Sequence, residues 1–122
     1  MLFRSAFAAT PDVPPYFIDR FVAAAHQQGM AATRLPDWPG LVAMRTVAML
    51  ANEAFEAMMQ GVGTAEAIDN AMRFGVNYPR GPVEWAQAIG LSEIVSTLDS
   101  LLRLTGDPRY RCSLGLRLGA AR

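Results

Sequence analysis

The sequence predicts a mainly α-helical domain, residues 37–122, preceded by a short β-α-β segment, residues 1–36. Apolar residues recur at spacings of three and four between residues 41 and 62, which indicates a long helix with a buried face. Glycines and prolines then divide the rest of the chain into segments of one helix each. Because 52% of the 122 residues are hydrophobic, the chain can bury one core and leave apolar surface for a partner.

The N-terminal segment has the order strand, helix, strand. The apolar residues 2–9 predict the first strand, and Met30–Leu35 the second. Between them, Pro15 suits the first turn of a helix, where its missing N–H has no partner to lose, and Gly29 can end that helix. The segment is too short for a dinucleotide-binding domain and has no G-x-G-x-x-G loop.

The long helix that follows organises the domain. We expect Asp37 to cap it and Pro39 to lie near its first position. Small residues among its apolar positions let neighbouring helices approach closely, so we expect it to be covered on more than one side. Its apolar positions are Leu41, Met44, Ala48, Ala51, Phe55, Met58 and Val62, widened by Val47, Leu50, Ala54 and Met59. Its polar edge is predicted to consist of Arg45, Asn52, Glu56 and Gln60.

A second helix begins just after the long one. Gly61 ends the long helix, and Thr64 can cap the next. Glu66 then lies in the first turn, where a carboxylate complements the helix dipole, and Gly75 stops the helix. Its apolar face is predicted to consist of Ala67, Ile68, Ala71, Met72 and Phe74.

The remainder holds a corner and three more helices. Residues 77–82 read Asn-Tyr-Pro-Arg-Gly-Pro and predict a stiff corner, because two prolines fix φ and Gly81 allows conformations that other residues avoid. Pro82 then opens the next helix. The predicted helices are residues 82–89, residues 91–104 with Ser92 as the cap, and residues 110–118.

Charge and cysteine content exclude several functions. Basic and acidic residues number 11 each and form no like-charge block, so nothing indicates a nucleic acid or a membrane surface as partner. No run of about 18 apolar residues predicts a membrane-spanning helix. The single cysteine excludes an internal disulfide and a cysteine-cluster metal site, and we expect no metal. Because no signal peptide is recognisable, we expect a cytoplasmic location.

The titratable residues form no recognisable catalytic set. His26 could act as a general base, but an ordinary helix residue is the favoured interpretation. We interpret Glu53 and Glu56 as members of a structural ion network with Arg45 and Arg80. Within it, we expect a contact between Arg45 and Glu53 along one helix face.

Three further features have structural interpretations. Asp69 is assigned a structural role for the same reason as the glutamates. Cys112 has no cationic neighbour in sequence except Arg111, so a reactive thiol is not expected. A set of methionines indicates core or interface packing rather than a cofactor site. The set comprises Met44, Met49, Met58, Met59 and Met72.

Six short motifs occur in a fixed order along most of the chain. They are P-G-x(4)-R at 39–45, N-E-A at 52–54, G-x(6)-I-D at 61–69, G-x(3)-P-x-G-P at 75–82, I-G-L at 89–91 and G-D-P-R-Y at 106–110. In this order and spacing, residues 36–115 resemble the C-terminal helical domain of the 3-hydroxyacyl-CoA dehydrogenase family. Tyr16–Leu35 also resembles the helix and strand that precede that domain. The resemblance implies a helical bundle like the C-terminal domain of 6-phosphogluconate dehydrogenase.

The resemblance implies a division of labour. In the family, a separate Rossmann domain binds NAD and supplies a catalytic His–Glu pair, while the helical domain closes over the acyl-CoA and forms the dimer interface. The resemblance thus implies that this chain binds no cofactor itself, and that NAD is bound only by a separate Rossmann domain. The candidates for the substrate groove are Met44, Arg45, Tyr78 and Arg80. The residues of the structural motif are Pro39, Gly40, Glu53, Asp69, Gly81 and Pro82.

One position departs from the family pattern. The family motif usually reads P-G-x(3)-N-R, and its Asn contacts substrate near the reacting carbon. Here Met44 occupies that position, and Arg45 matches the following Arg. We therefore expect no catalytic residue in this chain and no dehydrogenase activity of the chain alone.

Two functions stay open at this point. The chain is either the substrate-binding and dimerisation domain of a 3-hydroxyacyl-CoA dehydrogenase, as a domain fragment or as the partner of a separate Rossmann half, or a degenerate, non-catalytic module that forms dimers. The first implies NAD-dependent oxidation of a 3-hydroxyacyl-CoA; Met44 favours the second. Both predict a homodimer, because the long helix has more apolar surface than one domain needs.

Overall fold

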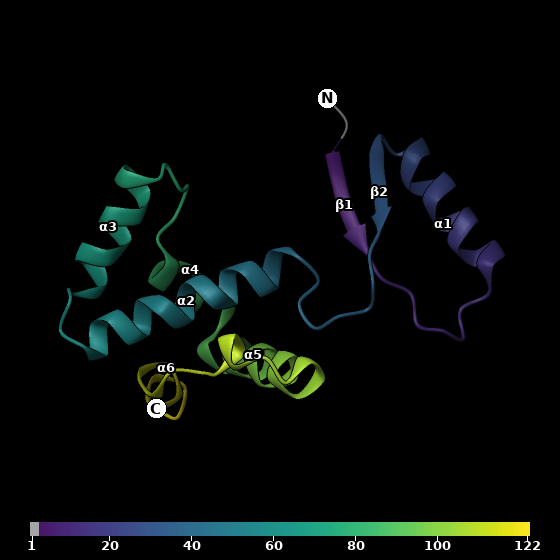
Figure 1. Cartoon of the computed structure of the whole chain (residues 1–122). Coiled ribbons are helices and arrows are strands. Elements are labelled where there is room, and N and C mark those ends of the chain that lie inside the picture. The colour runs from purple at the N-terminus through teal and green to yellow at the C-terminus, as the bar shows by residue number, and fades with distance from the viewer. Residues whose placement is uncertain (1–2) are drawn as a thin grey trace. The chain divides into compact units, whose positions relative to one another are not determined.

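The computed structural model describes residues 3–122, which divide into two compact units (Figure 1). Unit 1 comprises the described residues up to Leu41, and unit 2 comprises Val42–Arg122. Unit 1 contains strand, helix and strand, and unit 2 is helical, so the predicted mainly helical fold with a short β-α-β segment is confirmed.

Unit 1 is a parallel β-α-β arrangement. Its elements are β1 (Phe3–Phe7), α1 (Pro15–Gln27) and β2 (Met30–Arg34). The strands pair in parallel, with Phe3 opposite Met30, as the helical crossover between them requires. Gly29 has a φ of 75° and ends α1 as predicted, because glycine adopts this left-handed conformation without a steric penalty. Residue 2, the predicted start of the first strand, lies outside the described residues.

The aromatic residues of unit 1 are incompletely covered. The rings of Phe7 and Phe21 pack edge to face, with 4.8 Å between their centres, and Ala25 is buried. Phe17 is nevertheless 58% exposed. An apolar hollow of about 390 Å³ lies beside these rings. It is lined by Phe7, Ala8, Ala9, Thr10, Val13, Phe17, Ile18 and Phe21.

Unit 2 is a bundle around α2 (Figure 1). Its elements are α2 (Ala43–Met59), α3 (Ala65–Gly75), α4 (Pro82–Ile89), α5 (Leu91–Thr105), the 3-10 helix η1 (Pro108–Tyr110) and α6 (Leu114–Ala120). Helices α4, α5 and α6 all pack on α2, as expected for a helix with small apolar residues on several sides. Helix α3 lies at the outer edge, where it packs mainly on α4 and less closely on α2.

The core of unit 2 lies where α2 meets α4, α5 and α6. Ala48 and Ala51 of α2 have no exposed surface. A Cβ added to Gly115 of α6 would lie 2.8 Å from the backbone oxygen of Phe55, so only glycine lets α6 approach α2 this closely. The other fully buried apolar residues of the core are Ala86, Ile94, Leu98, Leu101 and Leu116.

The long helix begins at Ala43, four residues later than predicted. Gly40 and Leu41 have φ of 76° and 47°, and this left-handed backbone cannot continue into a right-handed helix. Asp37 and Pro39 therefore precede a turn, and neither caps nor opens the helix. The prediction of the helix start was wrong because the turn was not recognised.

The predicted helix over residues 110–118 is two elements. Residues 108–110 form η1, and the backbone is extended at Arg111. Helix α6 then starts at Leu114, where the Ser113 hydroxyl accepts a hydrogen bond from the Leu116 N–H (3.3 Å). Ser113 is thus an N-cap that the sequence interpretation placed inside a helix.

Two other expectations about helix residues were wrong. Ser92 does not cap α5, because the N-cap is Gly90, which has a φ of 106° and no side chain to accept a hydrogen bond. Phe74 and Val62, predicted on apolar faces, are 80% and 73% exposed. Helix α3 contributes no buried residue to its own unit, so its apolar pattern does not serve the core.

Candidate functional site

Asp69 of α3 holds the corner that precedes α4. Its carboxylate accepts hydrogen bonds from the backbone N–H groups of Val83 (2.8 Å) and Glu84 (3.0 Å). These N–H groups lie in the first turn of α4 and have no partner within that helix. Asp69 therefore caps α4 from another helix, where its charge also complements the helix dipole. Asp69 thus has the structural role that we expected, although its partners are backbone N–H groups and not the cation of an ion network.

Glycine is required at position 81 because a side chain would not fit there. Its φ of −75° is available to any residue, so conformational freedom is not the reason for glycine here. A Cβ added to Gly81 would instead lie 2.1 Å from Cγ of Asp69. The missing side chain thus lets the Asp69 carboxylate reach α4, and Pro82 occupies the first position of that helix.

The rest of the corner presents one aromatic and one cationic side chain. Asn77 has a φ of 59°, which asparagine tolerates better than most residues, and it turns the chain out of α3. The Tyr78 ring packs on the Trp85 ring, with 5.7 Å between their centres. Arg80 pairs with Glu84, with 3.7 Å between Nε and Oε1. Because the Arg80 side chain is exposed, its guanidinium is nevertheless accessible to an anion.

Met44 and Arg45 lie in the first turn of α2. Met44 is half-buried and packs against the core of unit 2, and Arg45 is also half-buried. Among residues 3–122, no hydrogen bond or ion pair joins either of them to Tyr78 or Arg80. Within the described residues, the structure thus shows no polar contact between the two candidates at the start of α2 and the two candidates at the corner.

The ion network predicted for α2 is not formed. Glu53 is exposed, and the described part of the chain shows no ion pair between it and Arg45. Glu56 instead accepts a hydrogen bond from the side-chain amide of Gln60 (2.9 Å), and Arg80 pairs with Glu84. Residues four apart on one helix meet, whereas the eight residues from 45 to 53 span about 12 Å.

Asn52 was predicted on the polar edge of α2, but it is buried. Its Nδ2 donates to the Arg111 carbonyl (2.9 Å), and its Oδ1 accepts from the Ser113 N–H (2.7 Å). This amide thus satisfies one acceptor and one donor of the extended segment between η1 and α6. In the sequence, Asn52 lies between Ala51 and Ala54, which were both assigned to the apolar positions of the helix. This position was the signal that could have indicated the burial of Asn52.

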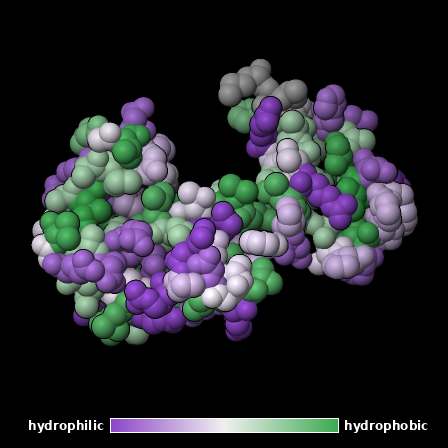
Figure 2. All heavy atoms as spheres, viewed as in Figure 1, coloured by the Kyte–Doolittle hydropathy of each residue, from purple (hydrophilic) through white to green (hydrophobic). Residues whose placement is uncertain are grey.

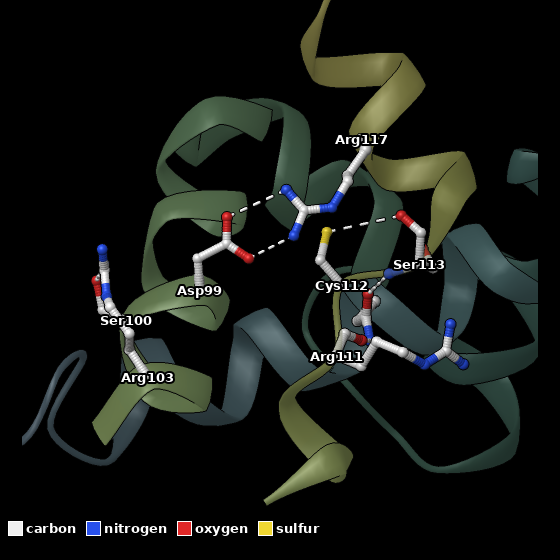
Figure 3. Close-up of polar contacts among 8 residues, drawn as sticks. Asp99, Ser100, Arg103, Arg111, Cys112, Ser113 and Arg117 are labelled. Carbon is white, nitrogen blue, oxygen red and sulfur yellow. Dashed lines mark hydrogen bonds and ion pairs between the residues drawn. The ribbon is translucent and has the colours of Figure 1, made fainter. Parts of the chain in front are cut away.

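A second polar cluster joins α5 and α6 (Figure 3). Both guanidinium Nη atoms of Arg117 contact the Asp99 carboxylate, one at 3.1 Å from Oδ2, and this pairing raises the pKa of Arg117. Cys112 is buried beside it, and its Sγ lies 3.6 Å from the Ser113 carbonyl oxygen. Because burial raises the pKa of the Cys112 thiol, the thiol is neutral at pH 7 and a weak nucleophile.

The described residues do not fit a dinucleotide. The segment between β1 and α1, residues 8–14, holds two prolines and no glycine, so it cannot form the phosphate-binding loop of a Rossmann fold. His26 is exposed near the C-terminal end of α1. No three His, Cys, Asp or Glu residues in the described range gather to hold a metal ion. No described helix is long and apolar enough to cross a membrane.

Comparisons with known proteins identify the family. The sequence model of the 3-hydroxyacyl-CoA dehydrogenase C-terminal domain matches residues 40–122. The chain is 46% identical over 89 residues to 3-hydroxyadipyl-CoA dehydrogenase of Escherichia coli strain K12, covering 72% of this chain and 19% of that protein. It is 39% identical over 75 residues to 3-hydroxybutyryl-CoA dehydrogenase of Bradyrhizobium diazoefficiens, covering 62% and 26% of the two chains.

Solved structures agree with this match. The crystal structure of 3-hydroxybutyryl-CoA dehydrogenase from Escherichia coli K12 superposes with a TM-score of 0.87 at 37% identity, covering 97% of this chain and 25% of that one. That of (S)-3-hydroxybutyryl-CoA dehydrogenase from Ralstonia eutropha gives a TM-score of 0.87 at 27% identity, covering 98% and 42%. These matches take in most of unit 1 as well as unit 2.

Unit 2 thus has the fold and the motifs of the C-terminal helical domain that the family model describes. The chain belongs to the 3-hydroxyacyl-CoA dehydrogenase family, and residues 40–122 match its C-terminal domain. The predicted family is therefore confirmed. The chain spans about a fifth to a quarter of the length of the two curated relatives named above.

Proposed function

We propose that this chain is the substrate-binding and dimerisation domain of a 3-hydroxyacyl-CoA dehydrogenase. It acts in the NAD-dependent oxidation of a 3-hydroxyacyl-CoA to a 3-oxoacyl-CoA, within fatty-acid or related acyl-CoA catabolism in the cytoplasm. NAD and the catalytic His–Glu pair come from a separate Rossmann domain, because the described residues do not fit a dinucleotide. The relatives named above are dehydrogenases of hydroxyacyl-CoA thioesters, which supports this substrate class.

The observation that carries the proposal is the corner braced by Asp69. A rigid turn that displays Tyr78 on Trp85 and an accessible Arg80 suits a ligand with both a flat ring and phosphate groups. Coenzyme A has both features. In this role Arg80 contacts phosphate, Tyr78 packs on the ligand, and Arg45 contributes at the start of α2. Asp69 and Gly81 keep the corner in place and do not touch the ligand.

Met44 favours the alternative that the domain is non-catalytic. An amide can hydrogen-bond a substrate oxygen in the transition state, whereas a thioether packed against the core cannot donate a hydrogen bond. The alternative function is therefore a degenerate module that forms dimers and has lost substrate turnover. It differs from the first proposal in one measurable property, which is specific binding of the acyl group.

Calorimetric titration with acetoacetyl-CoA tests the proposal, with free CoA as the control ligand. A substrate-binding domain gives saturable heat that depends on the acyl group. Absence of heat at high micromolar ligand, from a folded protein, contradicts the substrate-binding proposal and leaves the dimer module as the supported function.

A further inference from the structure

A surface hollow between α5 and α6 belongs neither to the core of unit 2 nor to the corner. Its volume is about 500 Å³, which is larger than that of the hollow in unit 1. Small-molecule sites in proteins have volumes of about 300–1,000 Å³, so the hollow is large enough for a ligand. It is lined by residues of α5, of α6 and of the C-cap of α6. They are Ser92, Val95, Ser96, Asp99, Arg103, Arg117, Ala120 and Ala121.

The α5 side of the hollow is a polar row. Its members follow each other at spacings of four, three and four, so they lie on one face of the helix. They are Ser92, Ser96, Asp99 and Arg103. The row is about 16 Å long, because each helical residue adds about 1.5 Å. Hydroxyl donors lie at its N-terminal end, and a guanidinium lies at its C-terminal end.

The two guanidinium groups of the hollow differ in their partners within the chain. Arg117 contacts the Asp99 carboxylate through both Nη atoms, so its charge is neutralised (Figure 3). Arg103 donates a hydrogen bond to the Ser100 hydroxyl (3.3 Å), and among residues 3–122 it forms no ion pair. Arg103 therefore leaves the side chains that line the hollow with one positive charge in excess.

The rest of the lining, called the apolar wall below, consists of Val95, Ala120 and Ala121. The methyl groups of the two alanines leave room for a ligand, and Val95 is half-buried. Figure 2 shows hydrophilic and hydrophobic side chains next to each other over α5 and α6. The hollow thus combines an apolar wall with hydroxyl donors and an accessible cation, which are the components of a site for a small amphipathic anion.

We propose that the hollow between α5 and α6 binds a small organic carboxylate, with its carboxylate group on Arg103 and its hydrocarbon part on the apolar wall. A carboxylate matches the single excess charge, and its two oxygens fit the fork of N–H donors of a guanidinium. A phosphate monoester carries about 1.5–2 negative charges at pH 7 and is repelled by the Asp99 carboxylate. This site is separate from the corner and adds a second ligand to the proposed function.

Titration with hexanoate tests the proposal, with amide chemical shifts of the full chain in ¹H–¹⁵N NMR spectra as the readout. We expect saturable shifts that are largest at residues 92–103 and 117–121. Hexyl phosphate and hexylamine are the comparison probes, because they carry the same hydrocarbon chain on a different charge. Hexyl phosphate is expected to bind at least threefold more weakly than hexanoate, and hexylamine is expected not to bind.

Three variants test the roles of the charged side chains. Arg103→Gln raises the dissociation constant of hexanoate about tenfold. Arg109→Gln is the matched control, because Arg109 is also an exposed arginine of unit 2 but does not line the hollow, and it leaves the constant unchanged. Asp99→Asn releases Arg117 and removes the repelling charge, so it strengthens the binding of hexyl phosphate more than that of hexanoate.

Several results would overturn the proposal. Absence of saturable shifts in the folded wild type up to about 20 mM hexanoate contradicts the site, and so does equal binding of hexanoate and hexylamine. Shifts that are largest at residues 77–85 contradict its location. Equal dissociation constants for Arg103→Gln and Arg109→Gln contradict the contact with Arg103. Failure of acetoacetyl-CoA binding, in contrast, affects the proposed function and none of these outcomes.

Discussion

Asn52 is a single side chain that determines the course of the backbone between η1 and α6. Both ends of its amide are used, one by Arg111 and one by Ser113, and no buried side-chain nitrogen or oxygen among the described residues is left without a partner. A buried polar group that is hydrogen-bonded adds little net free energy, but removing its partner is expensive. Replacing a buried and fully hydrogen-bonded side chain such as Asn52 is therefore expected to lower the free energy of unfolding strongly.

Asn52→Ala is expected to lower the free energy of unfolding by about 2–4 kcal/mol, because it leaves the buried Ser113 N–H and the part-buried Arg111 carbonyl without partners. Urea unfolding followed by circular dichroism measures the change. The neighbouring Glu53→Ala is the control, since Glu53 is exposed, and its effect should stay within about 0.5 kcal/mol. Equal effects of the two substitutions would contradict the role given to Asn52.

Cys112 makes the free energy of unfolding depend on pH in the alkaline range. Burial raises the pKa of its thiol above 9.0 in the folded protein, so the unfolded chain loses this proton first as the pH rises. The contribution of Cys112 to the free energy of unfolding is therefore complete below 9.0 and decreases above it. The difference between wild type and Cys112→Ala, measured by urea unfolding from pH 7 upward, should shrink above that value. A difference that grows with pH would contradict the burial of the thiol.

Helix ends were predictable where the deciding residue is local. Thr64 caps α3, with its hydroxyl accepting from the Ala67 N–H (3.2 Å), and Pro82 opens α4, as the sequence indicated. The Asp69 cap of α4 was not predictable from spacing alone, because the donor and acceptor are 14 residues apart. The start of α2 was missed because Leu41 adopts a positive φ that nothing in its residue type indicates.

The same limit applies to the candidate site. The motifs identified the corner and its residues, but only the contacts within the folded chain show that Gly81 is needed for the Asp69 side chain. They also show that Met44 and Arg45 make no polar contact with the corner among the described residues. Tertiary contacts over long sequence separations decided each of these points, and local patterns carry no information about them.

Gly81→Ala tests the junction between α3 and α4. The new Cβ would overlap the Asp69 side chain, so we expect the free energy of unfolding to fall by about 1–3 kcal/mol. Gly75→Ala is the matched control, because a Cβ there meets nothing within 4 Å in a helical conformation. This control should be neutral or stabilising by up to about 1 kcal/mol. A higher urea midpoint for Gly81→Ala than for Gly75→Ala would contradict the close approach of Asp69 to position 81.

At the scale of the whole molecule, the division of labour between domains makes a prediction about activity. The described residues do not fit NAD, so restoring the family residue at position 44 does not create a complete active site. Met44→Asn is therefore expected to form no NADH from a 3-hydroxyacyl-CoA and NAD. Absorbance at the NADH band measures this, and NADH formation by the purified variant would contradict the proposed separation of NAD and substrate sites.

The central claim is that the corner braced by Asp69 binds the coenzyme A part of an acyl-CoA. The measurement that tests it most directly is the dissociation constant of acetoacetyl-CoA for wild type and for Arg80→Gln, with Arg109→Gln as the control for loss of one exposed cation. We predict saturable binding by wild type, about tenfold weaker binding by Arg80→Gln, and no change for Arg109→Gln. Equal affinities of the three proteins, or no binding by folded wild type, would contradict the account.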